Sequence, residues 1–496
     1  MKNYPEVKLG IVAVSRDCFP KTLSEKRRSA VVSACNKKNI NIHEIKTMVE
    51  NEKDMLRAIE EINNSGCNSL LVFLGNFGPE TPETLLAANF KGPVMYAAAA
   101  EDDGNDLING RGDAYCGMLN CSYNLGLRKL KAVIPEYPVG TAEDIVPMIE
   151  DFIPVARAIL GLASLKIITF GPRPQDFFAC NAPINGLYNL GIEIEENSEL
   201  DLLIAFKKHK EDKRIPEVVE SMKNELGTGN RYPEILPQLA QFELTLLDWA
   251  EEHKGARKYV SFANKCWPAF QHEFRFMPCY VNSRLACRGI PVACEVDIYG
   301  ALSEYIGACI SQDAVTLLDV NNTVPKNMFD EKIKGKFPYS LEDTFMGFHC
   351  GNTPSCKLKK EENTGLKFQL IQNRLNENGG PPELSRGTME GDIIPGDITF
   401  FRLHGNPNGS LQAYIAQGEV LPVSTNSFGS IGVVAIPEMA RFYRHVLIEK
   451  HYPHHGAVVF GKFGKPLYTV FRYLDIPDIS YNHPKGLPYA TENPFV

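Results

Sequence analysis

The sequence predicts an α/β fold with two doubly wound domains, followed by a β-rich domain with an antiparallel, barrel-like sheet. Three observations support this fold class. Apolar strands alternate with amphipathic helices from the start of the chain, the alternation restarts near residue 165, and turn residues become dense after about residue 320. Such alternation is typical of parallel sheets covered by helices. Because 496 residues are too many for one hydrophobic core, we expect three domains, at residues 1–164, 165–310 and 311–496.

The first predicted domain begins with four apolar runs separated by helical patterns. The expected strands are residues 8–14, 41–45, 69–74 and 92–97, and the expected helices are residues 23–36 and 54–63. Polar and aromatic side chains follow these strands, including Arg16, Asn76 and Phe77. The segment from Gly75 to Gly78 lacks the G-x-G-x-x-G spacing of a dinucleotide fingerprint, so the sequence argues against a nicotinamide site.

The second predicted domain repeats the pattern of the first. Apolar runs predict strands at residues 165–172, 201–206 and 259–264, and the last of these leads into Trp267. The segment 290–320 then has the pattern of a strand, a helix and a second strand. We therefore expect this segment to form one β-α-β unit.

Each strand of that β-α-β unit ends at an acidic residue, Glu295 in the first and Asp319 in the second. Parallel neighbours lie about 5 Å apart, and ligands bind outside the carboxyl ends of such strands. We therefore expect Glu295 and Asp319 to meet at one sheet edge. Two carboxylates there can hold a divalent metal or divide acid and base catalysis. The alternative is that both acids cap helices.

The C-terminal part of the sequence is rich in turn residues between short alternating runs. The runs at residues 398–403 and 411–415 predict a hairpin-rich antiparallel sheet. A predicted helix at residues 439–449 leads into a histidine cluster at 451–455, ahead of a strand at residues 457–461. One imidazole of this cluster could complete a metal shell with two carboxylates, a ligand set that suits manganese or another divalent first-row ion. The alternative is an exposed histidine turn.

Composition narrows the class of protein. A formal net charge of −8 argues against nucleic acid as the main partner, and no run of 18 apolar residues predicts a membrane span. The polar start of the sequence does not resemble a signal peptide, so we expect a cytoplasmic protein. The 13 cysteines form no C-x-x-C pair and are expected to be reduced and mostly buried. Four histidines are isolated in sequence and are expected at the surface or capped: His272, His349, His404 and His445.

These residues taken together resemble the L-fucose isomerase family. The resemblance rests on the segments 291–297 and 318–320, on His455 followed by Gly456, and on the order of two α/β domains and a β-rich one. It covers essentially the whole chain. It places a domain border near residue 310, inside the segment that the residue pattern treats as one β-α-β unit.

The resemblance implies an aldose–ketose isomerase in which Glu295, Asp319 and His455 hold a manganese ion. His455 is preferred to His454 because the ligand in the family directly precedes a glycine. The family forms hexamers in which the first domain of a neighbouring subunit closes the site. Candidate sugar contacts in trans are therefore Arg16, Asn76 and Phe77. Position alone adds six further, weaker substrate candidates: Asn264, Lys265, Trp267, His349, Asn352 and His451.

The expected reaction moves one proton between C1 and C2 of the sugar and one between O1 and O2. A metal bound to both oxygens polarises the carbonyl and stabilises an enediolate. Glu295 and Asp319 would share the base and acid roles, in an order that the sequence leaves open. The expected substrate is an aldose of the L-fucose or D-arabinose type. Alternatives are L-arabinose or another sugar, a protein that clamps sugar without converting it, and a non-catalytic paralogue.

Overall fold

The computed structural model describes residues 2–108, 110–180, 183–369 and 385–493. Its contacts divide the chain into two compact units. The small unit comprises Pro5–Leu160 and Arg472–Leu474, and the large unit comprises Met1–Tyr4, Gly161–Phe471 and Asp475–Val496. The second and third predicted domains both lie in the large unit, so the domain border near residue 310 stays a prediction.

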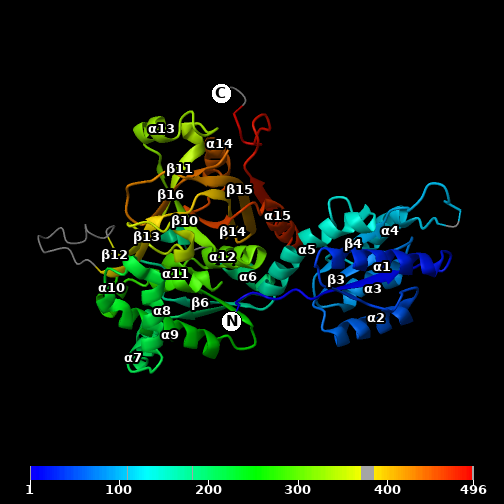
Figure 1. The fold of residues 1–496 in the computed structure, drawn as a ribbon, viewed down its shortest axis with the longest axis horizontal. Helices are drawn as coiled ribbons and strands as arrows, with labels where there is room; N and C mark the ends of the chain where they lie inside the picture. The colour runs from blue at the N-terminus through cyan, green and yellow to red at the C-terminus, as the bar shows by residue number, and fades with distance from the viewer. Residues whose placement is uncertain (1, 109, 181–182, 370–384, 494–496) are drawn as a thin grey trace, which may run out of the picture. The chain divides into compact units, whose positions relative to one another are not determined.

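The small unit contains a five-stranded parallel sheet with the order β2-β1-β3-β4-β5, shown mainly in blue and cyan in Figure 1. Its strands are β1 (Leu9–Val14), β2 (Ile42–Glu44), β3 (Ser69–Leu74), β4 (Val94–Ala99) and β5 (Val139–Gly140). Its helices are α1 (Lys21–Lys37), α2 (Glu52–Ser65), α3 (Glu80–Asn89) and α4 (Ala114–Leu127), and α5 (Ala142–Leu162) runs on into the large unit. Every residue of β1, β3 and β4 is buried, which explains their unbroken apolar runs. The four strands predicted here are confirmed.

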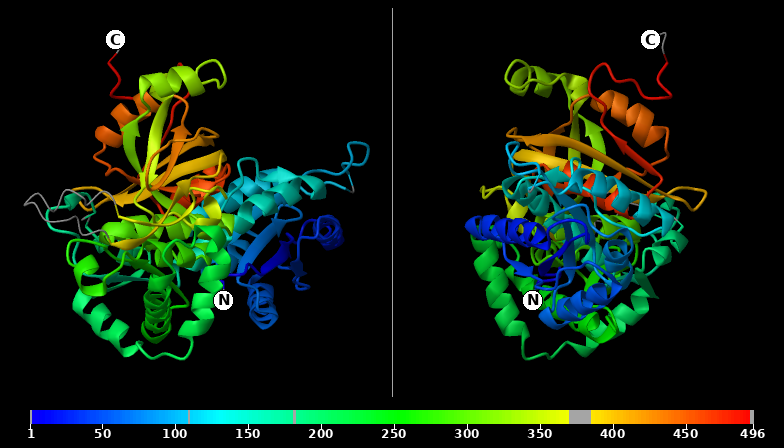
Figure 2. Two further views of the ribbon diagram at one scale, coloured as in Figure 1. Left: turned by 60° about the vertical axis from the view of Figure 1, so that its left-hand side comes forward. Right: turned by 90° about the vertical axis from the view of Figure 1, so that its right-hand side faces the viewer.

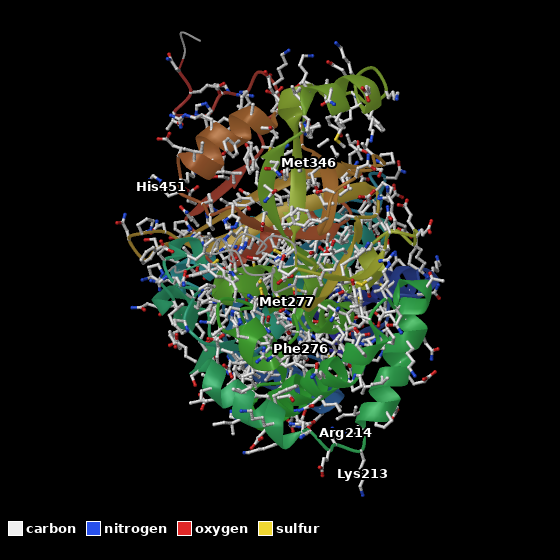
Figure 3. The ribbon with its side chains drawn as sticks, turned by 90° about the vertical axis from the view of Figure 1, so that its left-hand side faces the viewer. Lys213, Arg214, Phe276, Met277, Met346 and His451 are labelled. Atoms are coloured by element: carbon white, nitrogen blue, oxygen red, sulfur yellow. The ribbon has the colours of Figure 1, made fainter. Side chains whose placement is uncertain are left out.

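The large unit begins with a four-stranded parallel sheet of order β7-β6-β8-β9. Its strands are β6 (Leu165–Phe170), β7 (Glu193–Asn197), β8 (Tyr259–Ala263) and β9 (Val292–Ala293). Its helices are α6 (Asn185–Asn189), α7 (Glu199–Lys208), α8 (Ile215–Leu226), α9 (Leu236–His253), α10 (Phe270–Phe274), α11 (Cys279–Cys287) and α12 (Ile298–Ser311). In Figure 3, Phe276 and Met277 lie in the interior of this unit, while Lys213 and Arg214 lie at its rim.

A nine-stranded, mainly antiparallel sheet forms the rest of the large unit, with the order β12-β13-β16-β11-β10-β17-β14-β15-β18. Its strands are β10 (Thr316–Thr323), β11 (Thr344–His349), β12 (Gly365–Phe368), β13 (Arg386–Asp392), β14 (Gly396–Gly405), β15 (Leu411–Leu421), β16 (Ser430–Ala435), β17 (His455–Phe460) and β18 (Asp478–Tyr481). An additional pairing of β15 with β16 closes a ring of antiparallel strands, β16-β11-β10-β17-β14-β15 (Figure 2). A ring of this kind leaves its strands without free edges.

Three helices accompany this sheet: α13 (Lys326–Lys332), α14 (Met439–Phe442) and α15 (Gly464–Tyr473). A π-helical turn, Tyr443–Ile448, continues α14. The helix predicted at residues 439–449 is therefore present in a modified form. It ends just before the histidine cluster, whose last member, His455, opens β17. The predicted hairpin is also confirmed, because residues 398–403 and 411–415 lie in the antiparallel pair β14 and β15.

The prediction of a β-α-β unit at residues 290–320 is wrong in one respect. The helix is present as α12, but β10 pairs antiparallel with β11 and β17 and is not a parallel neighbour of β9. Residues Tyr299–Ile310 of α12 are all buried, and the helix contacts β6, β8 and β9 as well as β14 and β17. It is buried because it lies between the two sheets, so the strands before and after it belong to different sheets.

The prediction of a strand at residues 201–206 is also wrong, because this segment lies in α7. The hydroxyl of Ser198 accepts a hydrogen bond from the Asp201 backbone N–H, and the Asp201 side chain accepts one from the Ser198 N–H. This capping box starts a helix. Only Leu202 and Leu203 of the helix are buried. The short apolar run is thus one face of a surface helix, which periodicity alone does not distinguish from a buried strand.

Among the described residues, no helix is both long and apolar enough to cross a lipid bilayer.

Candidate active site

A strained turn positions Glu295 at the end of β9. Glu295 and Val296 have φ values of 60° and 58°, in the left-handed region that non-glycine residues rarely occupy. The Val296 N–H donates to the Asn264 carbonyl at 3.0 Å, and the next residue, Asp297, begins α12 by accepting from the Gly300 N–H at 2.8 Å. These two hydrogen bonds therefore stabilise the turn in its unusual conformation. Strained backbone of this kind is concentrated at functional sites.

The register of the antiparallel sheet positions the other two residues. Asp319 in β10 lies directly opposite His455 in β17. Directly paired residues on adjacent strands present their side chains to the same face of the sheet. This pairing brings a carboxylate and an imidazole together although they are distant in sequence.

The three side chains converge on one point. The Nε2 atom of His455 lies 3.4 Å from the Glu295 carboxylate (Oε2) and 3.4 Å from the Asp319 carboxylate (Oδ1). His455 is almost fully buried, and Asp319 Oδ1 is a buried atom with no hydrogen-bond partner in the described part of the chain. Burial raises the pKa of Asp319 to about 7, to which Glu295 also contributes, and burial likewise raises the pKa of Glu295. The cluster therefore buries two carboxylates beside a single imidazole, whose attraction acts against the rise in both pKa values.

The distance from His455 Nε2 to each carboxylate fits a shared cation, and the ligand atoms of Glu295, His454 and His455 also lie within 4.8 Å of one another. Two ligand atoms that each lie about 2.1 Å from one metal ion are separated by about 3.0–3.5 Å, depending on the coordination geometry. The unpartnered Asp319 Oδ1 is a ready ligand, and one imidazole with two carboxylates suits a divalent first-row ion. The site could therefore hold a divalent metal through Glu295, Asp319 and His455.

A buried ion pair fixes the other side of the His455 ring. The Nδ1 atom lies 2.9 Å from Asp297 Oδ2, and both carboxylate oxygens of Asp297 accept hydrogen bonds from Arg402 at 2.8 Å. Although burial alone would raise the pKa of Asp297, Arg402 and His455 hold it well below its usual value. Asp297 therefore accepts the Nδ1 proton and leaves Nε2 available to a metal, as carboxylate partners of ligand histidines do.

Three further groups surround the cluster. The Trp267 indole N–H lies 3.4 Å from Glu295 Oε1, and the Cys180 thiol lies 3.9 Å from Glu295 Oε2 and 3.7 Å from His455 Nδ1. The ring of Phe177 makes edge contacts with Trp267 and with His454, at centroid distances of 6.2 and 5.5 Å. Aromatic rings and hydrogen-bond donors beside a carboxylate cluster are suited to a sugar, which has apolar faces and polar edges.

A cavity of about 780 Å³ opens beside the cluster. Its walls include Val320, which follows Asp319, and His454, whose Nε2 lies 3.9 Å from Asp319 Oδ1. Phe178, His404 and His451 line it as well. His451 is exposed, and Figure 3 shows it at the edge of the large unit. The cavity is large enough for a small-molecule ligand.

The other predicted substrate residues of the large unit have structural contacts near the site. Asn264 is buried and exchanges side-chain hydrogen bonds with Asn282 at 3.4 and 3.3 Å. The Asn352 amide donates to the Val292 carbonyl at 2.9 Å, and its Oδ1 is buried without a partner. Their role in substrate binding stays a prediction.

Three predicted contacts, Arg16, Asn76 and Phe77, cluster at the strand ends of the small unit. The Arg16 backbone N–H donates to Asn76 Oδ1 at 2.9 Å, and the Arg16 guanidinium lies 5.0 Å from the centroid of the Phe77 ring. Their expected contact with sugar in a neighbouring subunit stays a prediction.

Sequence reasoning missed several residues of this site. It expected His349 and His404 at the surface or capped, but both are buried. Burial lowers the pKa of His349 to about 3, so its ring is neutral. Its Nδ1 accepts the Cys350 N–H at 2.9 Å, which leaves an unpartnered Nε2–H group. The ring centroid lies 6.3 Å from that of His455. His349 was a substrate candidate from its position, but no local sequence pattern marks Phe177, Cys180 or Arg402, because these three are brought to the site by the fold.

Comparison with known proteins identifies domain families at both ends of the chain. Residues 10–163 match the N-terminal domain of fucose/sulfoquinovose isomerases, and residues 347–481 match the C-terminal domain of L-fucose isomerase. The two matched regions lie on either side of the segment that carries Glu295 and Asp319.

Curated relatives are similar to longer stretches of the chain. Sulfoquinovose isomerase of Priestia aryabhattai is 26% identical over 328 residues, which is 65% of this chain and 66% of the relative. The chain thus aligns with slightly less than two thirds of that relative. Sulfoquinovose isomerase of Clostridium sp. (strain MSTE9) is 24% identical over 435 residues, 84% of this chain and 88% of the relative. The similarity is therefore distant but extends over most of the chain.

Proposed function

Since this chain belongs to the L-fucose isomerase-like family, we propose that it is an aldose–ketose isomerase that acts through an enediol(ate). One observation supports this function above all. Two carboxylates, Glu295 and Asp319, each approach the same imidazole nitrogen of His455 at 3.4 Å, beside a cavity of about 780 Å³. A sugar-binding protein would not need such a cluster.

Glu295, Asp319 and His455 would hold a divalent metal, with manganese as the expected ion. When bound, the metal would act as a Lewis acid toward the carbonyl and the adjacent hydroxyl of the sugar. The Asp297–Arg402 ion pair would keep the imidazole in the orientation that binding needs.

The same carboxylates are positioned to move protons. One would remove the proton from C2 of the aldose, and that proton would return to C1 of the ketose. The other would pass a proton between O1 and O2. The Trp267 N–H would orient Glu295 by donating to Oε1, and the order of the two roles stays open.

A sulfonated aldose is the first substrate candidate, because the curated relatives are named sulfoquinovose isomerases. Arg173 supports this choice. Its guanidinium stacks over Phe178 at 4.3 Å, Phe178 lines the cavity, and the Arg173 Nε atom has no hydrogen-bond partner among the described residues. An arginine at this place can pair with an anionic sugar substituent. An L-fucose- or D-arabinose-type aldose is the second candidate. The hexameric assembly and the cytoplasmic location stay predictions by resemblance.

A ketose assay on a panel of aldoses tests the function. The panel should include sulfoquinovose, L-fucose, D-arabinose and L-arabinose, each with chelator, with added Mn²⁺, and with neither. We expect turnover of at least one aldose that chelator abolishes and Mn²⁺ restores. Metal bound without turnover of any sugar would instead indicate a non-catalytic paralogue.

Two neighbouring histidines test the ligand set. His455→Ala should lose the metal, measured by elemental analysis after dialysis, because it removes the atom on which both carboxylates converge. His454→Ala is the matched control and should retain metal, since His454 lies at the cavity wall, 3.9 Å from Asp319. Release of the ion by His454→Ala alone would show that the ligand choice is wrong.

A further inference from the structure

Two cysteines that are far apart in sequence meet on the surface of the large unit. Cys287 ends α11, and Cys356 lies in the 3-10 turn Ser355–Lys357. Their sulfur atoms are 2.8 Å apart across 69 positions of the chain, and both residues are exposed. Non-bonded sulfur atoms normally stay farther apart, and a disulfide bond measures about 2.05 Å. The two sulfur atoms therefore lie close to bonding distance.

The pair lines a polar cavity of about 830 Å³, separate from the cavity beside Glu295. Its lining carries charges of both signs, from Arg284, Arg288 and Lys360 and from Glu225, Glu361 and Glu362, and it leaves room for a small reagent beside the sulfur atoms. Within the pair, the Cys356 thiol hydrogen bond lowers the pKa of Cys287 to about 7. The Ser355 hydroxyl, 3.7 Å from the Cys287 sulfur, acts in the same direction. A thiolate is the nucleophile in thiol–disulfide exchange.

We propose that Cys287 and Cys356 form a site of reversible oxidation, at which a low-molecular-weight disulfide such as oxidised glutathione converts the two thiols into one disulfide. The Cys287 thiolate attacks a sulfur of the oxidant, forms a mixed disulfide and releases one thiolate. The Cys356 thiol then loses its proton and attacks the Cys287 sulfur, which releases the second thiolate. In total, two protein thiols are oxidised and one small disulfide is reduced to two thiols.

The new bond would reinforce a junction that already exists between α11 and the segment after β11. The Ser355 N–H donates to the Ser283 hydroxyl at 2.7 Å, next to this pair. Because the sulfur atoms already touch, closure should leave the Glu295 turn in place. It should also raise the temperature of unfolding, since a cross-link constrains the unfolded chain.

The test uses the full chain, reduced, freed of reductant and equilibrated with excess oxidised glutathione. Remaining thiols are then blocked by alkylation, and peptides are mapped by mass spectrometry without reduction. We expect a peptide that joins Cys287 to Cys356, the loss of two alkylated thiols, and full recovery of both after dithiothreitol. Cys356→Ser should stop at a glutathione adduct on Cys287. Cys18→Ser, which removes another exposed cysteine, should behave as the wild type.

Several outcomes would overturn the proposal. These are full alkylation of both cysteines after the oxidant, glutathione adducts on the wild type without a cross-link, or a cross-link that joins Cys287 or Cys356 to a different cysteine. The readout is a covalent bond, so it is independent of isomerase activity and of metal content. Failure here would therefore leave the proposed catalytic function untouched.

Discussion

The two sides of the His455 ring present opposite environments within a few ångströms. On the Nδ1 side, Asp297 and Arg402 form a buried pair that is 1% and 0% exposed, with every carboxylate oxygen hydrogen-bonded. On the Nε2 side, Glu295 and Asp319 bring two carboxylates together, and Asp319 Oδ1 has no hydrogen-bond partner. One side is satisfied by the protein itself, and the other side holds the groups to which we assign metal binding.

The two sides of His455 therefore differ in role: the paired side is rigid, and the other side carries the reactive groups. A buried polar network in which every group is paired fixes its members in one arrangement. A buried polar group without a partner costs free energy unless something from outside pairs with it. The satisfied side of His455 thus acts as a support, and the unsatisfied side is where metal and substrate are expected to bind.

The largest expected effect tests the unsatisfied side. Glu295→Gln and Asp319→Asn should each lower kcat by about 10²–10⁴-fold, because each removes a group that transfers a proton. Steady-state ketose formation with excess Mn²⁺ measures the loss. Glu217→Gln, on the exposed face of α8, is the control and should keep the wild-type rate. A residual rate near the wild type in both site variants would remove these acids from the mechanism.

A second prediction tests the satisfied side. Asp297→Asn should destabilise the large unit by about 3–5 kcal/mol, since it leaves the Arg402 guanidinium buried without its counter-charge. Metal affinity should also fall by about 10–100-fold, because His455 loses the partner that orients it. Urea unfolding followed by circular dichroism and a metal titration measure the two effects.

The control for Asp297→Asn is Glu449→Gln, which breaks the exposed ion pair between Arg444 and Glu449. Exposed pairs contribute little to stability, so the unfolding midpoint should not change measurably. If Asp297→Asn were as stable as this control, the Nδ1 side would not be the support that its geometry indicates.

The smallest expected effect concerns the orientation of Glu295. Trp267→Phe removes the N–H that lies 3.4 Å from Glu295 Oε1 and keeps an aromatic ring against Phe177. Because this hydrogen bond is long, it should contribute about 1 kcal/mol, so kcat/KM should fall about fivefold. Trp249→Phe is the matched control, because the indole nitrogen of this other tryptophan has no partner among the described residues. A larger loss in Trp249→Phe would contradict this assignment.

The local sequence pattern was most informative for buried strands, because their residues form a continuous apolar run. It predicted β3 at residues 69–74 and the hairpin that contains residues 398–403 and 411–415. It failed at residues 201–206, where a capping box at Ser198 starts a helix. It also paired the wrong strands around α12, because a helix buried on all sides lies between two sheets, which no single segment reveals.

The residue types that could carry the chemistry were recognisable along the chain: acids at the ends of two apolar runs and a histidine before a glycine, which the family resemblance joined into one candidate set. The fold was needed to show that Glu295 comes from a strained turn and Asp319 from an antiparallel strand opposite His455. It also supplied Asp297 and Arg402 as the support behind the imidazole. The physical reason is that strand register and the packing of α12 between two sheets depend on contacts between distant segments, which local periodicity does not encode.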